Sequence, residues 1–153
     1  MRKFIPILAF ASLVTSYRPG EPVAKLTCKS ESGRTSFTAV LPSCSYLEKA
    51  ELSIDKSKLQ FEARDRSSII FDPENKVFTI FLESRSDDPK KNKFLKFWGI
   101  PSTFKKTKSE KGTGSEFHDI YEFRAKLYAS EPRNISQPNT KEIELICLLD
   151  YEL

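Results

Sequence analysis

Ile143-Glu-Leu-Ile-Cys-Leu-Leu-Asp-Tyr151, close to the end of the chain, carries an apolar side chain at every second position. An apolar period of two is typical of a β-strand that buries one face. Near the other end of the chain, Ala24-Lys-Leu-Thr-Cys-Lys29 alternates in the same way, and Cys28 is in phase with its apolar residues. We therefore expect the folded part of the chain to begin and end with a half-buried strand.

The same period recurs between these two ends. Alternating or continuous apolar runs occupy residues 24–29, 37–41, 50–54, 59–63, 69–71, 76–83, 93–100, 116–130 and 141–151. Apolar residues do not recur three and four apart over more than about two turns, which disfavours helices. The pattern predicts an all-β fold in one domain spanning residues 17–153. We expect a single antiparallel β-barrel or β-sandwich of about eight strands, with a lipocalin-like meander favoured.

The first sixteen residues have the composition of an export signal. Arg2 and Lys3 precede an apolar run over residues 4–14, and Ser16 offers a small residue for cleavage before Tyr17. The run is too short to span a membrane, which takes about 20 residues. A buried N-terminal strand is the alternative interpretation. We expect residues 1–16 to be a cleaved signal peptide, the protein to be periplasmic or secreted, and the mature chain to have no transmembrane segment.

Three cysteines would then meet an oxidising environment, where thiols form disulfides. Cys28 and Cys147 lie in the middle of the first and last predicted strands, which commonly meet when a barrel or sandwich closes. Cys44 lies in a connection, about eight positions too far along the second strand to reach Cys28 easily. The spacing favours a Cys28–Cys147 bond, with Cys28–Cys44 and a fully reduced chain as alternatives.

Positive charge gathers in one part of the chain. The net charge is +4, yet residues 85–111 alone hold nine basic and three acidic side chains. Aromatic residues interleave with lysines over residues 90–111. Lysines attract phosphate or carboxylate groups, and exposed rings stack on sugars or enter a lipid headgroup region. The candidate ligand-binding residues are Lys93, Lys96, Trp98, Phe104, Lys105, Lys106 and Lys108.

The alternative interpretation of this segment is structural. Strand alternation would point Leu95 and Phe97 to one face and Phe94, Lys96 and Trp98 to the other, so several rings would belong to the core and the lysines would be ordinary surface charge. If the segment does bind, its expected partners are anionic lipid, lipopolysaccharide or acidic glycan. Nucleic acid is not expected, because no arginine-rich element or recognition helix is visible. The sequence leaves the oligomeric state open.

Catalytic motifs are absent from the sequence. With His118 as the one histidine, the chain holds neither an H-E-x-x-H motif nor a His-rich metal site, and it lacks a G-x-S-x-G elbow. His118 is out of phase with Tyr121 and Phe123, which places it on an outer face. No catalytic residue, metal or cofactor is assigned, and the expected role is non-catalytic binding. A small-ligand carrier with a cavity in the barrel is an alternative, and so is an inhibitor that uses residues 101–114 as a protruding loop.

A few residues resemble a known family. Leu26-Thr27-Cys28, followed by Gly33 and Phe37 and by a second cysteine near the C-terminus, is similar to the outline of small periplasmic lysozyme-inhibitor barrels. The resemblance implies a β-barrel that binds a protein. The inhibitory S-G-x-x-Y-type loop of that family has no counterpart, because Ser115-Glu116-Phe117 does not match it. No functional residue is carried over.

Overall fold

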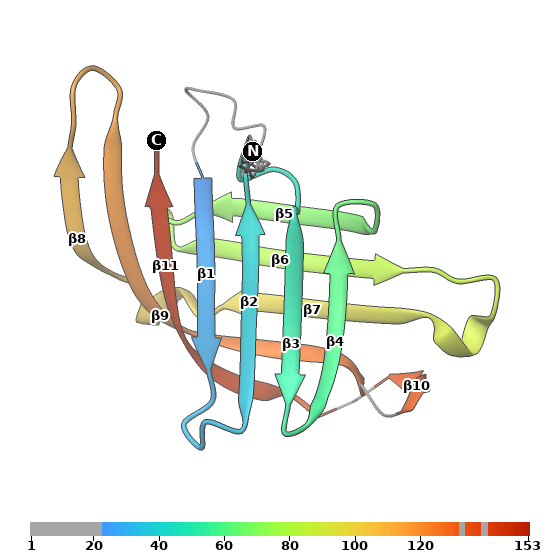
Figure 1. Ribbon diagram of the computed structural model, residues 1–153. Coiled ribbons are helices and arrows are strands. Elements are labelled where there is room, and N and C mark those ends of the chain that lie inside the picture. Colours follow the sequence, from blue (N-terminus) through green and yellow to red (C-terminus); the bar gives the residue numbers. More distant parts are fainter. Residues whose placement is uncertain (1–22, 132–133, 139–140) are drawn as a thin grey trace, which may run out of the picture.

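A computed structural model describes residues 23–131, 134–138 and 141–153, and the predicted signal peptide lies outside this part. The described chain is almost entirely β-structure (Figure 1). Its strands are β1 (Val23–Lys29), β2 (Thr35–Leu41), β3 (Lys49–Ile54), β4 (Ser57–Glu62), β5 (Arg66–Asp72), β6 (Val77–Ser84), β7 (Lys93–Gly99), β8 (Lys105–Lys111), β9 (Phe117–Glu131), β10 (Asn134–Pro138) and β11 (Ile143–Glu152). Two 3₁₀ turns, η1 (Pro89–Lys91) and η2 (Pro101–Thr103), flank β7.

The strands form one curled antiparallel sheet, in which the first strand, β1, pairs with the last, β11. The order of the main path is β4-β3-β2-β1-β11-β9-β7-β6-β5, and β8 and β10 pair with other parts of β9. Most neighbours in this order are successive along the chain; β10 is skipped between β9 and β11, β8 is skipped between β7 and β9, and the β1–β11 seam joins the first strand to the last. The path ends at β4 and β5, which follow one another in sequence but are not paired. The sheet is therefore a half-barrel, and the predicted all-β antiparallel fold is confirmed.

Strands β9 and β11 run through both layers of this curled sheet. One edge of β9 pairs with β11, whereas the other pairs first with β8, at residues 117–122, and then with β7, at residues 125–129. Figure 1 shows β1 to β4 upright and β5 to β7 crossing behind them, with the long bent strands β9 and β11 belonging to both groups. Strands that change layer in this way form the corners of orthogonally packed sheets.

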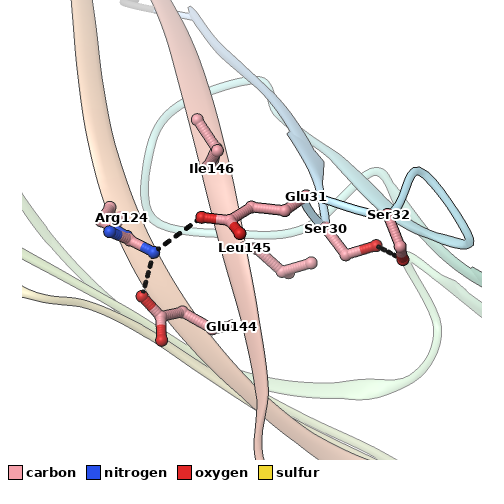
Figure 2. Close-up of a pocket in the computed structure, with 7 residues that line it drawn as sticks. All are labelled: Ser30, Glu31, Ser32, Arg124, Glu144, Leu145 and Ile146. Carbon is pink, nitrogen blue, oxygen red and sulfur yellow. Dashed lines mark hydrogen bonds and ion pairs between the residues drawn. The ribbon is translucent and has the colours of Figure 1, made fainter.

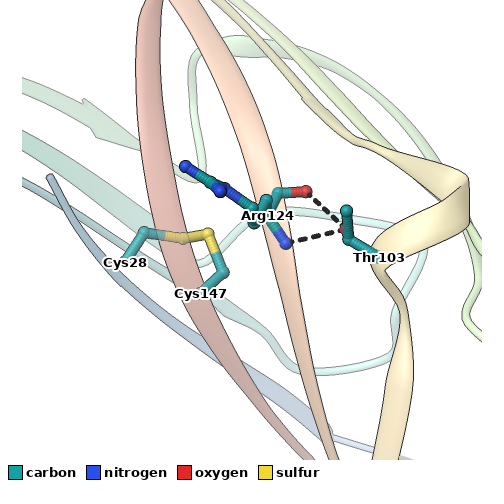
Figure 3. The surroundings of a disulfide bond; sticks show 4 residues. All are labelled: Cys28, Thr103, Arg124 and Cys147. Atoms are coloured by element: carbon teal, nitrogen blue, oxygen red, sulfur yellow. Dashed lines mark hydrogen bonds between the residues drawn. A yellow bond between two sulfur atoms is a disulfide. The ribbon is translucent and has the colours of Figure 1, made fainter. Parts of the chain in front are cut away.

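The change of partner along β9 occurs at Arg124, where η2 supplies the hydrogen bonds. The backbone N–H of Arg124 donates to Thr103 Oγ1 at 2.9 Å (Figure 3). Its carbonyl accepts from the N–H of Ile100, the residue before η2, at 2.8 Å. Polar backbone groups at this corner are thus paired, although neither β7 nor β8 reaches them.

Phenylalanine rings fill the space between the layers. Phe37 of β2 lies 5.4 Å from Phe97 of β7, and Phe97 lies 5.6 Å from Phe78 of β6, measured between ring centroids. Phe61 and Phe123 are buried in the same cluster. These residues occupy alternate positions on their strands, so the period of two in the sequence places them inward. Rings in contact across the layers give the half-barrel a packed interior.

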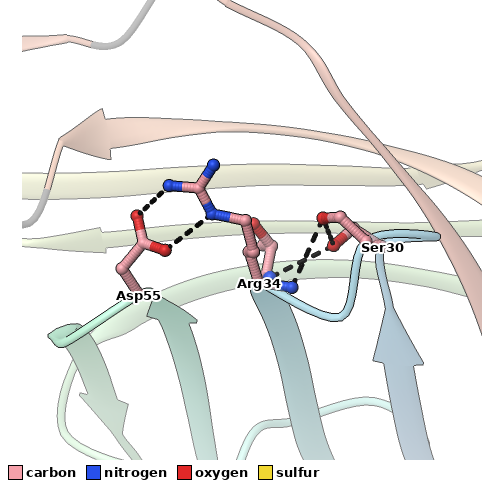
Figure 4. A network of polar contacts seen from close by, with 5 residues as sticks. Ser30, Arg34 and Asp55 are labelled. Atoms are coloured by element: carbon pink, nitrogen blue, oxygen red, sulfur yellow. Dashed lines mark hydrogen bonds and ion pairs between the residues drawn. The ribbon is translucent and has the colours of Figure 1, made fainter.

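Two tight turns at the same end of the upright layer are tied together. Arg34, after the β1–β2 turn, makes two hydrogen bonds to the carboxylate of Asp55 in the β3–β4 turn, at 2.9 and 3.1 Å (Figure 4). Ser30 Oγ accepts from the N–H of Thr35 across the first turn. Asp55 has a φ of 51°, a left-handed conformation that aspartate tolerates better than most residues.

The disulfide joins the two ends of the meander. Cys28 and Cys147 are direct partners in the β1–β11 register, with their Cα atoms 4.1 Å apart and their sulfur atoms bonded (Figure 3). The predicted pairing is confirmed. Cys44, in the loop between β2 and β3, is not part of this disulfide. Its partial burial raises the pKa of the thiol to about 11, which keeps it protonated at neutral pH.

Strand β8 departs from the sequence-based expectation. Residues 101–114 were expected to be a loop, but Lys105–Lys111 is a strand paired with β9. All seven of its residues are exposed, so it has no apolar period to reveal it. It forms because β9 continues past the end of β7 and offers an unpaired edge. The expected loop is thereby corrected to a hairpin strand over residues 105–111, and the inhibitor alternative stays a prediction.

Replacing both Cys28 and Cys147 by alanine is expected to lower the free energy of unfolding by about 4 to 5 kcal/mol, because the bond closes a loop of 119 residues. Equilibrium urea unfolding in oxidising buffer measures the change. The matched control is Cys44→Ala, for which we expect a change of about 1 kcal/mol or less. Equal stability of the double variant and the parent chain, or a peptide map linking Cys44, would contradict the expectation.

Candidate functional site

The outer side of β7 carries aromatic and basic side chains. Leu95 and Phe97 point into the core and are fully buried, so the alternating residues Phe94, Lys96 and Trp98 lie on the outside. Phe94 and Trp98 are half-buried by their neighbours, and Lys96 is exposed. The strand alternation expected from the sequence is therefore observed, and it separates this segment into a core side and a surface side.

Neighbouring strands extend this surface. In the register of the sheet, Lys96 lies between Phe81 of β6 and Tyr128 of β9. The Phe94 and Tyr128 ring centroids are 5.7 Å apart, and Lys96 Nζ lies 5.2 Å from the centre of the Trp98 ring. We name Phe81, Phe94, Lys96, Trp98 and Tyr128 the aromatic face. It gathers four rings and one ammonium group on the outer side of three adjacent strands.

Lys96 is the available positive charge of the aromatic face. Its ammonium lies over an indole, and among the described residues no carboxylate pairs with it. Lys126, which faces Trp98 from β9, is instead bound to Glu142 at 2.9 Å. Phe81 remains 39% exposed, which is unusual for so large an apolar side chain. The face thus offers exposed rings and an ammonium group that no carboxylate of the described residues neutralises.

Lys93 has a structural position at the opening of the half-barrel. Its ammonium donates to the Gln60 carbonyl of β4 at 2.6 Å and lies 5.5 Å from the centre of the Phe61 ring. The side chain therefore bridges from β7 to the edge strand β4. An ammonium group held at the unpaired edge of β4 discourages strands of other molecules from pairing there.

Phe104 belongs to the core. It is 9% exposed and stacks on Phe123, with ring centroids 4.2 Å apart and planes 9° from parallel. Gly99 leaves the space for this pair, since a Cβ there would lie 2.6 Å from a carbon of the Phe104 ring. The ligand-binding role expected for Phe104 is therefore replaced by a packing role.

The three lysines of β8 that were predicted as site residues point in different directions. Lys105 and Lys108 lie opposite Glu122 and Ile120, on the outer side of β9, and Lys108 pairs with Glu110 at 3.1 Å. Lys106 lies opposite Tyr121, on the inner side, and the irregularity between Lys106 and Lys108 returns Lys108 to the outer side. The seven predicted site residues are thus divided among the aromatic face, the opening, the core and the two sides of β8.

Lys106 is the centre of a polar cluster under the β8–β9 hairpin. Its ammonium binds the Glu74 carboxylate of the β5–β6 turn and lies 3.1 Å from Asp119 Oδ2. The Tyr121 hydroxyl donates to Glu74 Oε1 at 2.6 Å. Asp119 is buried, and its other oxygen, Oδ1, has no hydrogen-bond partner among the described residues.

These contacts shift the pKa values within the cluster. Hydrogen bonds from Lys106 and Tyr121 lower the pKa of Glu74, because both stabilise its carboxylate. The same bond to Glu74 raises the pKa of Lys106. Burial raises the pKa of Tyr121 to about 12, with its bond to Glu74 as a further cause. At neutral pH the cluster therefore holds a charged lysine, a charged glutamate and a neutral tyrosine.

A surface pocket lies elsewhere, on the outer side of β9 and β11. It has a volume of about 260 Å³, and Arg124 lies in it between two carboxylates, Glu31 at 3.2 Å and Glu144 at 2.7 Å (Figure 2). The guanidinium is already neutralised by these two groups. The pocket therefore offers no free positive charge to an anionic ligand.

Comparison of the chain with protein-family models, with curated proteins and with solved structures finds no match. Within the described residues, no helix has both the length and the apolar character needed to cross a membrane. The site is therefore interpreted from its own geometry.

The sequence alone did not reveal Phe81 and Tyr128 as members of the aromatic face, because they lie beside Lys96 only through the strand register. Phe81 did carry a signal, since it is an apolar residue on the outer side of its strand.

Gly99→Ala is expected to lower the free energy of unfolding by about 1 to 3 kcal/mol, because the added methyl group would overlap the Phe104 ring. Equilibrium denaturant unfolding measures the effect. In a Phe104→Leu background the same substitution should cost less, since residues in contact are energetically coupled. An equal cost in both backgrounds would show that the ring is not what constrains Gly99.

Glu74→Gln is expected to change the pH dependence of stability. The lowered pKa of Glu74 means that its carboxylate stabilises the fold above the unfolded-state pKa, near 4.3, and that this contribution is lost as the pH falls through the folded pKa. The parent chain should therefore exceed the variant most clearly near pH 7, by about 1 kcal/mol or less because Glu74 is exposed. Unfolding curves between pH 3 and pH 7 test this, with Glu48→Gln as a control. A difference that does not shrink at low pH would contradict it.

Proposed function

We propose that the protein is an exported, non-catalytic binding protein whose aromatic face binds acidic glycans. The observation that carries the proposal is the Lys96 ammonium, which lies over the Trp98 ring and pairs with no carboxylate of the described residues, on an outer side of β6, β7 and β9 that carries four aromatic rings. Sugar rings pack on aromatic faces, and a lysine beside them pairs with a carboxylate, sulfate or phosphate substituent. Export rests on the signal-like residues 1–16.

Acidic glycans fit this face better than anionic lipid does. The rings are held within a sheet and are partly covered by one another, as Phe94 and Tyr128 are. Membrane-surface binding usually relies on a large apolar side that enters the headgroup region. A rigid row of half-exposed rings instead suits a ligand, such as a glycan, that packs its own rings along the row. Lipopolysaccharide, which presents charged sugars, falls in the same chemical class.

The alternatives have less support in the geometry. A small-ligand carrier needs a cavity of about 300 Å³ or more, whereas phenylalanine rings in contact occupy the interior. A lysozyme-inhibitor-like role would need a protruding loop, and residues 105–111 are held as a strand.

Lys96→Glu is expected to weaken binding of an acidic oligosaccharide by tenfold or more, because it replaces attraction by repulsion at the centre of the aromatic face. Trp98 is the chain's one tryptophan, so its intrinsic fluorescence reports binding at this face directly. Titrations should use uronic-acid and sulfated oligosaccharides, with a neutral oligosaccharide of equal length for comparison. Affinity should fall as salt rises.

The matched control is Lys56→Glu, which makes the same charge change in the exposed β3–β4 turn. Binding should be retained there. Equal losses in the two variants would indicate general charge attraction and contradict the assignment of the face. Binding to vesicles of anionic phospholipid without binding to any acidic glycan would contradict the ligand class.

A further inference from the structure

His118 lies among three carboxylates that come from two neighbouring strands. It is on the outer side of β9, as its phase in the sequence predicts, with Glu110 of β8 directly opposite on one edge and Glu152 of β11 directly opposite on the other. Asp150 lies two residues before Glu152, on the same side of β11. Side chains opposite one another on one face of a sheet lie about 5 Å apart at Cβ. The strand register therefore gathers these four groups.

Both nitrogens of the imidazole face a carboxylate oxygen. Nε2 lies 2.8 Å from Asp150 Oδ1, and Nδ1 lies 4.0 Å from Glu110 Oε2. One donor atom each from His118, Asp150 and Glu152 can be chosen so that all lie within 4.8 Å of one another. The three side chains are half-buried, so they are accessible to an ion but restricted by their neighbours.

Negative charge in this group exceeds the nearby positive charge. Lys108 pairs with Glu110 at 3.1 Å. Lys25 lies opposite Asp150 in β1, but no ion pair between them is found among the described residues. With a neutral imidazole, Asp150 and Glu152 keep two charges that a divalent ion would balance.

We propose that His118, Asp150 and Glu152 bind a divalent transition metal of the zinc class, with Glu110 as a further donor. One imidazole nitrogen and two carboxylate oxygens are ligand types that Zn²⁺ accepts, with water completing a four-coordinate shell. Ca²⁺ and Mg²⁺ prefer oxygen ligands, so they fit a set of ligands that contains an imidazole nitrogen less well. The bound ion would link β9 to the last residues of β11. This site is separate from the aromatic face and does not depend on its ligand.

The test uses the full mature chain without a polyhistidine tag, stripped by chelator and titrated with ZnCl₂ in a calorimeter. We expect one zinc per chain and an affinity at least tenfold lower for both His118→Asn and Asp150→Asn. Asp87→Asn, which removes a carboxylate outside the group, should leave binding unchanged. Because His118 is the one histidine, ¹⁵N-detected NMR of the imidazole needs no further assignment, and one ring nitrogen should shift strongly on zinc addition.

Two results would overturn the proposal. One is the absence of one-to-one binding in the parent chain. The other is zinc binding that leaves the imidazole signals unmoved and persists in Asp150→Asn, since that would be adventitious binding to surface carboxylates. The spectroscopic measurement on the parent chain keeps the test valid even where a variant folds poorly.

Discussion

The antiparallel pairing of β1 with β11 is the constraint on which the rest of this structure depends. It joins the first and last described strands of the antiparallel sheet, and it places Cys28 directly opposite Cys147. The disulfide fixes this register, because a slip of one strand by one residue would place the two cysteines on opposite sides of the sheet. Without the seam, β1 to β4 and β5 to β11 would be two separate sheets, each with an exposed apolar side.

The long strand β9 determines where functional side chains can gather. It is paired on one edge with β11 over most of its length, and its other edge passes from β8 to β7 at Arg124. Outward residues on its C-terminal half therefore meet the rings of β7 and β6, whereas those on its N-terminal half meet Glu110 of β8. The two proposed sites arise from one strand because its two halves have different neighbours.

The period of two in the sequence was sufficient to predict the strands that have a buried side, as well as the disulfide. Hydrophobic burial of alternate residues produces that signal, so a strand with no buried side, such as β8, escapes it. The candidate site was only partly predictable for a related reason. Lys96 and Trp98 are close in sequence, but Phe81 and Tyr128 reach them through pairing between distant segments. His118 and Asp150, 32 residues apart, likewise meet only through the register of β9 and β11.

The two proposed sites lie at different positions along the outer side of β9, and the charged residues between them are neutralised. The acidic group around His118 and the ring of Tyr128 are ten residues apart, or about 33 Å along an extended strand. Exposed charges that are further apart than the screening length, about 8 Å at physiological ionic strength, are largely screened from one another. Between them, Arg124 and Lys126 are each neutralised by glutamates of neighbouring segments. An anionic glycan on the aromatic face is therefore not repelled by the carboxylates near His118. A metal ion there would not be needed for glycan binding, so each site can be tested while the other is left intact.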